Sequence, residues 1–226
     1  MPFHVDRLWW LCAASAVGFV LAGCQRSGDK PETSQVVEAE PDAEQAPTAA
    51  AKTPPSAEYF PTAVLETSSG KLTIKLDPQS APRTVHNFLH YVESGFYDQT
   101  IFHQVEAGYV ILGGGYTSEL AEKPGRYPIP NEAANGRKNR RGTVAMARDP
   151  NAIDSSTCQF FINLSDNPHL DHRGDDAADF GYCVFGEVID GLDVLDRIAA
   201  ASVQATEHFE KLPVETVLIE AAYRLR

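Results

Sequence analysis

The chain has 226 residues, which is enough for one or at most two domains. Its formal net charge is −12 at pH 7, and an acidic chain is repelled by phosphate backbones, so nucleic acid is not expected as a partner. The basic run at 137–141 is the exception, and we interpret it as a solvated loop with one structural arginine.

The first 23 residues have the pattern of an export signal. Arg7 precedes an apolar run, Leu8–Gly23, which is shorter than the roughly 20 apolar residues of a membrane span. The run ends in small residues, as a secretory segment does. The ending Leu-Ala-Gly-Cys at 21–24 resembles a bacterial lipobox. That resemblance implies cleavage of residues 1–23 and lipidation of Cys24. The alternative is a plain signal peptide with a chance cysteine.

A lipidated Cys24 would anchor the protein without spanning the bilayer. Each buried methylene contributes about 0.8 kcal/mol, so two or three acyl chains hold firmly where a single chain is marginal. The next residue is Gln25 rather than Asp, which by resemblance to bacterial sorting rules favours the outer membrane. We therefore expect a lipid-anchored, periplasm-facing protein of the cell envelope, with the lipid bilayer as a partner.

Residues 24–58 form the next segment of the chain. They include five prolines and consist mostly of Ala, Glu, Ser and Thr, a composition that buries too little apolar surface to fold. We interpret this segment as a disordered tether that separates a domain at 59–226 from the membrane. The sequence carries no signal for oligomeric state, and we expect a monomer.

The domain is predicted to begin with a β-hairpin followed by a helix. Residues 62–67 and 71–77 alternate apolar and polar side chains around a Ser-Ser-Gly turn at 68–70. The helix is predicted to begin at Pro82, with Ser80 as the candidate cap. Apolar residues then recur at helical spacing until Gly95, at Val85, Phe88, Leu89 and Val92.

Six further strands and a second helix follow. The predicted strands are 101–105, 109–112, 143–146, 160–164, 182–188 and 214–221, and the helix covers 192–199. Eight strands with two helices and no βαβ alternation predict a mainly β domain, a closed eight-stranded antiparallel barrel capped by two α-helices. Cys158 and Cys183 adjoin these strands, and either a disulfide or two free buried thiols fits the sequence.

Seven short motifs occur in order within residues 62–222. They are APRTVHNF at 81–88, GFY at 95–97, FHQVEAGYVILGG at 102–114, NEA at 131–133, RGTVAMA at 141–147, QFFIN at 159–163 and GYCVFG at 181–186. Their order and spacing resemble those of the cyclophilin-type peptidyl-prolyl isomerases. The resemblance implies a capped barrel, prolyl cis–trans isomerisation in the folding of exported proteins, and proline-containing polypeptides as partners.

The chemistry of that reaction defines what a site must contain. Rotation about a prolyl bond has a barrier of about 18–20 kcal/mol because twisting destroys amide resonance. Twisting also makes the proline nitrogen basic. A catalyst therefore needs an apolar pocket for the ring, a donor aimed at that nitrogen, and groups that hold the flanking backbone. The reaction requires no nucleophile, and we predict neither metal nor cofactor.

The resemblance also implies a set of site residues. Gln104 stands at the position of the catalytic donor, and the ring pocket comprises Tyr109, Val110, Phe161 and Leu170. The other substrate-binding positions are Phe102, Leu112, Ala147, Arg148, Gln159, His169 and Tyr182. Each aromatic could instead be ordinary core packing. We expect Phe160 to be core, since neighbours in a strand face opposite ways.

Two positions depart from the family pattern. The family has arginine at the position of Gln104 and glutamine at that of Leu112. A neutral amide donates hydrogen bonds about half as strong as charge-assisted ones, so the sequence predicts reduced activity. The alternative is a catalytically impaired module that binds proline peptides. Arg148 is expected either to act as a substitute cation or to face solvent in the groove.

Overall fold

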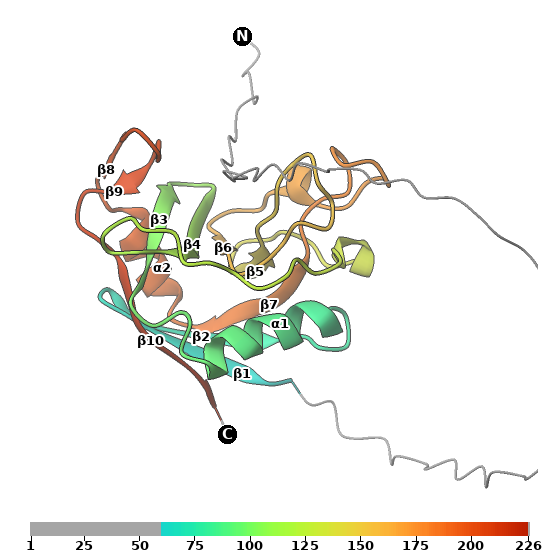
Figure 1. Ribbon diagram of the computed structural model, residues 1–226, viewed down its shortest axis with the longest axis horizontal. Coiled ribbons are helices and arrows are strands. Elements are labelled where there is room, and N and C mark those ends of the chain that lie inside the picture. The colour runs from blue at the N-terminus through green and yellow to red at the C-terminus, as the bar shows by residue number, and fades with distance from the viewer. Residues whose placement is uncertain (1–59, 226) are drawn as a thin grey trace, which may run out of the picture. The chain divides into compact units, whose positions relative to one another are not determined.

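The computed structural model describes residues 60–225, in which eight strands form a closed barrel in the order β1-β10-β3-β4-β6-β5-β7-β2 (Figure 1). The barrel strands are β1 (Thr62–Thr67), β2 (Gly70–Leu76), β3 (Thr100–Glu106), β4 (Val110–Thr117), β5 (Thr143–Met146), β6 (Phe160–Asn163), β7 (Val184–Asp190) and β10 (Leu218–Leu225). Neighbouring barrel strands pair antiparallel. The predicted barrel is confirmed. The predicted signal peptide, Cys24 and the tether lie outside the described residues.

Two α-helices pack against different strands of the barrel. Helix α1 (Pro82–Glu93) contacts β7 and β10, and α2 (Leu192–Ala199) contacts β2 and β3. The shorter elements are the 3₁₀ turns η1 (Ala133–Asn135) and η2 (Pro168–Leu170), and the two-stranded sheet of β8 (Val203–Gln204) and β9 (Leu212–Pro213). Within residues 60–225 no helix is both long and apolar enough to cross a bilayer.

The cap of α1 differs from the prediction. Ser80 does not cap the helix; Ala81 occupies the N-cap position and makes no side-chain cap bond. Instead the carboxylate of Glu132 accepts hydrogen bonds from the Arg83 and Thr84 backbone N–H groups, at 3.2 and 2.8 Å. The Thr84 hydroxyl also donates to Glu132, at 2.7 Å. The unpaired N–H groups of the first turn are thus satisfied by a residue 48 positions away, which short-range capping rules do not detect.

Glycines in β4 let aromatic side chains fill the barrel. A Cβ at Gly113 would lie 2.7 Å from the Phe102 ring, and one at Gly114 would lie 2.8 Å from Tyr97 and 2.9 Å from Phe160. Gly114 also has φ of +83°, a conformation that favours glycine. Phe160 is fully buried in this core, as predicted.

Three strands differ from the prediction by more than one residue at an end. β4 extends beyond residue 112 to Thr117, through the glycines. β7 begins at Val184 rather than at Tyr182, whose backbone N–H donates to the carbonyl of Leu170 at 2.9 Å. β10 begins at Leu218 because the preceding segment pairs elsewhere: Val214 donates its backbone N–H to Ser202 at 2.8 Å.

The structure decides between the two alternatives for the cysteines. Cys158 and Cys183 are both buried and both free. Burial raises the pKa of the Cys183 thiol to about 12 and also raises the pKa of Cys158. Both side chains are therefore neutral thiols near pH 7, without the thiolate character that reactivity requires.

Candidate functional site

An apolar pocket lies on the side of the barrel formed by β3, β4 and β6. Its lining residues are Gln104, Tyr109, Val110, Leu112, Phe161, Leu170 and Tyr182. All seven are among the predicted site residues, although the first and the last, Gln104 and Tyr182, are separated by 78 positions in the sequence. The volume of the apolar pocket is about 20 Å³, which is room for about one water molecule.

Strand register explains why these side chains meet. Gln104 on β3 is the cross-strand partner of Leu112 on β4, and Leu112 is in turn the partner of Phe161 on β6. Directly opposed residues of an antiparallel pair lie on the same face of the sheet. The three side chains therefore form a row across three strands, facing away from the barrel interior.

Phe102 does not join this row, contrary to the prediction that it binds substrate. Residues two apart in a regular strand share a face, but β3 is irregular between Phe102 and Gln104. A bulge of this kind re-aims the side chains on either side of it. Phe102 is fully buried in the barrel core, 6.1 Å from the ring of Phe160.

The walls of the pocket form an apolar cluster that is separate from the barrel core. Phe161 and Tyr182 pack edge-to-face with ring centroids 5.6 Å apart. Ala147 belongs to this cluster and is buried behind the pocket rather than lining it. Such aromatic and aliphatic walls suit a small apolar ring.

Tyr109 and His169 form a stacked pair at the edge of the pocket. Their ring centroids lie 5.4 Å apart with an interplanar angle of 19°, and His169 Nε2 is 3.3 Å from the Tyr109 hydroxyl. His169 is exposed and does not itself line the pocket. Burial, followed by the nearby Tyr182 and Glu106, raises the pKa of Tyr109, so its hydroxyl stays neutral.

Arg148 is a structural residue, and neither expectation for it is met. Its side chain is only 4% exposed, so it does not face solvent. Nε donates to the carbonyl of Gly181 at 2.9 Å, and Nη2 donates to that of Ala177 at 2.7 Å. Nη1 donates to the carbonyls of Asp149 and Pro150, at 2.9 and 3.1 Å. Since four backbone acceptors engage the guanidinium, it is not available as a substitute cation.

Arg148 also lies 4.9 Å from the centre of the Tyr182 ring, which packs edge-to-face on Phe161. Burial lowers the pKa of Arg148, partly offset by Tyr182 and Asp149. The guanidinium thereby ties the loop after β5 to the segment before β7 and supports the Tyr182 wall.

The Gln104 side chain is available to a ligand. It is partly exposed and has no hydrogen-bond partner among residues 60–225. No charged side chain is among the residues that line the pocket. The site therefore offers one neutral N–H donor within apolar walls.

Gln159 lies beside the pocket rather than in its lining. A Cβ at Gly115 would come within 2.6 Å of the Gln159 side chain, so this glycine makes room for it. The Gln159 Oε1 atom is buried without a hydrogen-bond partner in the described part of the chain, and leaving such an acceptor unpaired costs about 1–3 kcal/mol.

A buried polar network that we did not predict supports the pocket from behind. Asn139 donates through Nδ2 to the carbonyl of Leu170 at 3.0 Å, and Asn167 donates to that of Tyr109 at 3.0 Å. Asn163 links them, since it donates to Asn139 at 3.2 Å and accepts from Asn167 at 2.8 Å. The asparagines lie near turns in the sequence, and turn chemistry alone gives no signal that they hold two pocket residues.

His103, which sits within the third motif, is also absent from the pocket. It is buried between Tyr116 and Phe209, with ring centroids 4.7 and 5.4 Å away. Burial lowers its pKa to about 3, so it is neutral at physiological pH. Among the described residues no group of three or more His, Cys, Asp and Glu side chains is placed to hold a metal ion.

Comparisons with known proteins identify relatives of the barrel domain. Residues 62–223 match the family model described as "Cyclophilin type peptidyl-prolyl cis-trans isomerase/CLD". The chain is 44% identical over 159 residues to peptidyl-prolyl cis-trans isomerase A of Dickeya dadantii, covering 70% of this chain and 82% of that protein. It is 46% identical over 155 residues to peptidyl-prolyl cis-trans isomerase B of Escherichia coli, covering 69% and 94%.

A solved structure gives a matching fold. A crystal structure of a Cryptosporidium parvum cyclophilin-type peptidyl-prolyl cis-trans isomerase superposes with a TM-score of 0.62 at 25% identity. The match covers 74% of this chain and 99% of the other. A second crystal structure of that protein, determined in the presence of the dipeptide Ala-Pro, gives a TM-score of 0.61.

Proposed function

This chain belongs to the cyclophilin-type peptidyl-prolyl cis-trans isomerases, and we propose that it isomerises Xaa-Pro bonds at the apolar pocket with a reduced rate. One observation carries the proposal. The pocket places a free Gln104 amide next to apolar walls while no charged side chain lines it. The apolar walls that would contact a proline ring are thus present, although the pocket of about 20 Å³ must open to admit the ring, and the part that stabilises the twisted amide is weakened.

The geometry suggests how each part acts. Phe161, Leu170 and Val110 would receive the proline ring, and the Gln104 N–H₂ group would donate to the proline nitrogen as that atom becomes basic. This hydrogen bond forms only in the twisted state, so it lowers the barrier rather than merely tightening ground-state binding. No covalent intermediate is required.

The reduction in rate follows from the charge of the donor. A guanidinium is a permanent cation with a rigid fork of donors, whereas an amide donates without charge. Removing a transition-state donor typically costs on the order of 10²–10³ in rate. The neutral amide of Gln104 should therefore supply only part of this rate acceleration. Arg148 does not replace the missing cation, because backbone carbonyl groups accept hydrogen bonds from its guanidinium.

A second candidate function is that of a proline-peptide-binding module with little turnover. The neutral lining of the pocket favours it, because apolar walls alone bind both ground-state isomers and the twisted state to similar extents. Uniform binding of this kind does not accelerate the reaction.

The cellular setting is proposed from the N-terminal sequence. The signal-like residues 1–23, Cys24 and the Pro-rich segment 24–58 support a lipid-anchored protein of the cell envelope that acts on exported polypeptides. The outer membrane is the favoured location because Gln25 follows the cysteine.

A protease-coupled isomerisation assay on the full-length protein tests the proposal. We expect catalysis above the uncatalysed rate, and we expect Gln104→Met, which keeps the length of the side chain but removes the donor, to lower it. Equal activity of the wild type and Gln104→Met would reject the role of the amide. Saturable binding of a proline peptide without catalysis would support the binding module instead.

A further inference from the structure

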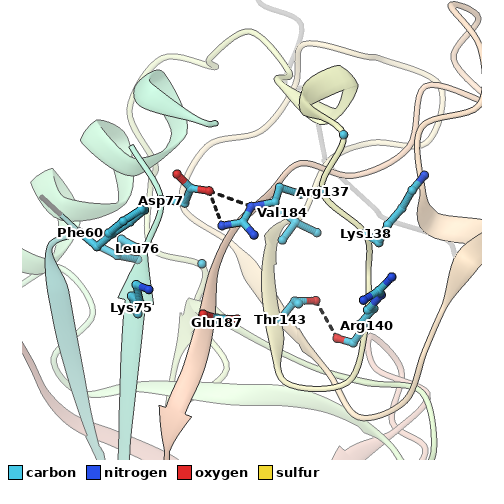
Figure 2. Close-up of a pocket in the computed structure, with 12 residues that line it drawn as sticks. Phe60, Lys75, Leu76, Asp77, Arg137, Lys138, Arg140, Thr143, Val184 and Glu187 are labelled. Atoms are coloured by element: carbon cyan, nitrogen blue, oxygen red, sulfur yellow. Dashed lines mark hydrogen bonds and ion pairs between the residues drawn. The ribbon is translucent and has the colours of Figure 1, made fainter. Parts of the chain in front are cut away.

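A second pocket, here called the basic pocket, shares no lining residue with the apolar pocket (Figure 2). It is lined by Phe60, Lys75, Leu76, Asp77, Gly136, Arg137, Lys138, Arg140, Thr143, Val184, Gly186 and Glu187. Most of these residues come from β2, β5, β7 and the loop after η1, while Phe60 precedes β1 and Asp77 follows β2. Its volume is about 270 Å³, just below the range of about 300–1,000 Å³ that drug-sized ligands occupy.

The lining is positively charged although the chain as a whole is acidic. Four lining side chains are basic and two are acidic, whereas the whole chain has a net charge of −12. Figure 2 shows Lys75 on one side of the pocket and Lys138 and Arg140 on the other. A concave surface of one sign focuses the electrostatic field and attracts ions of the opposite sign.

One of the two acids is already neutralised. The Arg137 guanidinium donates to Asp77 Oδ2 through Nη2 and, at 2.7 Å, through Nε. Asp77 is only 5% exposed and also accepts the backbone N–H groups of Gln79 and Ser80, at 3.2 and 3.1 Å. This pair forms a fixed wall, so Asp77 does not compete with a ligand for the remaining cations. Lys138, in turn, lies 3.5 Å from Asp171, which is not in the pocket.

Among residues 60–225, Arg140 and Lys75 have no acidic side chain within ion-pair distance, although Glu187 on β7 is the cross-strand neighbour of Lys75 on β2. Neither side chain forms an ion pair or donates a hydrogen bond within residues 60–225. Arg140 differs in this respect from Arg141, which pairs with Asp196. The Lys75 ammonium lies 4.4 Å from the centre of the Phe60 ring, an arrangement that steadies the cation without neutralising it.

Gly186 on β7 contributes backbone to the lining. A Cβ there would lie 2.8 Å from the carbonyl of Lys75 and 3.2 Å from the core side chains of Ile74 and Leu76. The glycine therefore permits close packing of β7 on β2. Glu187 also lines the pocket, and its carboxylate opposes an anion.

We propose that the basic pocket binds a phosphate-class oxyanion, free or in a lipid headgroup, between Arg140 and Lys75. The guanidinium fork of Arg140 matches the geometry of phosphate oxygens, and Lys75 adds a point charge. The volume of about 270 Å³ accommodates a phosphate with some water. This site is independent of the proposed isomerase activity, because none of its residues lines the apolar pocket.

Calorimetric titration of the full-length protein with inorganic phosphate tests the proposal. Arg140→Gln and Lys75→Gln are each expected to weaken binding at least tenfold. Glu187→Gln should tighten binding, since it removes the opposing charge. Arg141→Gln is the matched control, because it makes the same charge change in the same run of sequence but outside the pocket, and it should leave binding unchanged.

Two kinds of vesicle distinguish the source of the phosphate. Phosphatidylglycerol and phosphatidylcholine vesicles are compared, and the difference in binding between them is measured for the wild type, Arg140→Gln and the control Arg141→Gln. The site is assigned to a lipid headgroup if the wild type prefers phosphatidylglycerol vesicles, Arg140→Gln loses this preference, and free phosphate does not bind. The proposal is overturned if neither probe binds, or if Arg140→Gln and Arg141→Gln behave alike in both arms.

Discussion

Gln104 on β3 and Leu112 on β4 are direct cross-strand partners, and both line the apolar pocket. The two departures from the family pattern are therefore one local change rather than two separate ones. Together they replace a charged and a polar side chain by a neutral amide beside an alkyl group. Because residues in contact couple energetically, substitutions at the two positions are best tested as a pair.

Gln104→Arg should raise kcat/KM by about 10- to 100-fold, which corresponds to about 1.4–2.7 kcal/mol of transition-state stabilisation. The physical reason is the stronger hydrogen bond that a guanidinium donates to the pyramidal nitrogen. Isomerisation rates of the wild type and the variant, with thermal unfolding measured alongside, check this. A correctly folded variant with unchanged kcat/KM would mean that the pocket of about 20 Å³ does not open for a proline ring.

Adding Leu112→Gln to Gln104→Arg should raise activity further, because a second polar group would hold the substrate backbone. The gain should differ from that of Leu112→Gln in the wild-type background, since the two side chains are neighbours. A double-mutant cycle on kcat/KM measures this difference. Strict additivity would show that the two positions act independently despite their register.

Much of the barrel and of the apolar pocket could be predicted because the information is local. The alternation of 62–67 and 71–77 predicts the first hairpin, and six of the seven residues that line the pocket lie within the motifs, Leu170 being the exception. Phe102 could not be placed correctly, because its direction depends on an irregular pairing within β3 rather than on its own residue type.

The remaining errors come from partners far apart in sequence. The first turn of α1 is capped by Glu132, 48 residues from Thr84, so the nearby Ser80 was the wrong choice. The acceptors of Arg148 include Ala177 and Gly181, 29 and 33 residues away. A sequence pattern shows that these residues are polar, but only the folded backbone shows which carbonyl groups surround them.

Arg148→Met should destabilise the fold by about 3 kcal/mol, the upper end of the usual cost of leaving buried hydrogen-bonding groups unsatisfied. The change leaves four backbone carbonyl groups without their donor. Urea unfolding of the wild type and the variant measures the difference. Arg173→Met serves as the control, because Arg173 forms an exposed ion pair with Asp179 and should cost less than about 1 kcal/mol. Equal effects of the two changes would contradict the structural role of Arg148.

Cys24→Ser should abolish lipid attachment and release the mature protein from the membrane fraction. The expectation follows from the Leu-Ala-Gly-Cys ending of a short apolar run, and from the marginal binding that remains without acyl chains. Incorporation of radiolabelled fatty acid into both forms, followed by membrane fractionation, measures it. Equal labelling of the wild type and Cys24→Ser would reject the lipoprotein interpretation.

His103 should make the stability of the domain depend on pH in a region where carboxylates contribute little. Burial lowers its folded-state pKa from 6.5 to about 3. Between these pH values His103 is therefore protonated in the unfolded chain and neutral in the folded chain. Stability must therefore fall as the pH decreases from about 6.5 towards 3. Between pH 7 and pH 5 the expected loss is about 2 kcal/mol, since the limiting slope is about 1.4 kcal/mol per pH unit.

The matched variant for this prediction is His103→Leu, which removes the titrating group and also the Nδ1 atom that is buried without a partner in the described residues. Its neighbours Tyr116 and Phe209 present aromatic surfaces, so an alkyl side chain suits the site. Urea unfolding at pH 7, 6 and 5 gives the free energy of unfolding for both proteins. The wild type should lose about 2 kcal/mol more than the variant over this range. Parallel pH profiles would mean that His103 gains a proton in the folded state, and that the packing between β3 and the β8–β9 sheet opens to solvent.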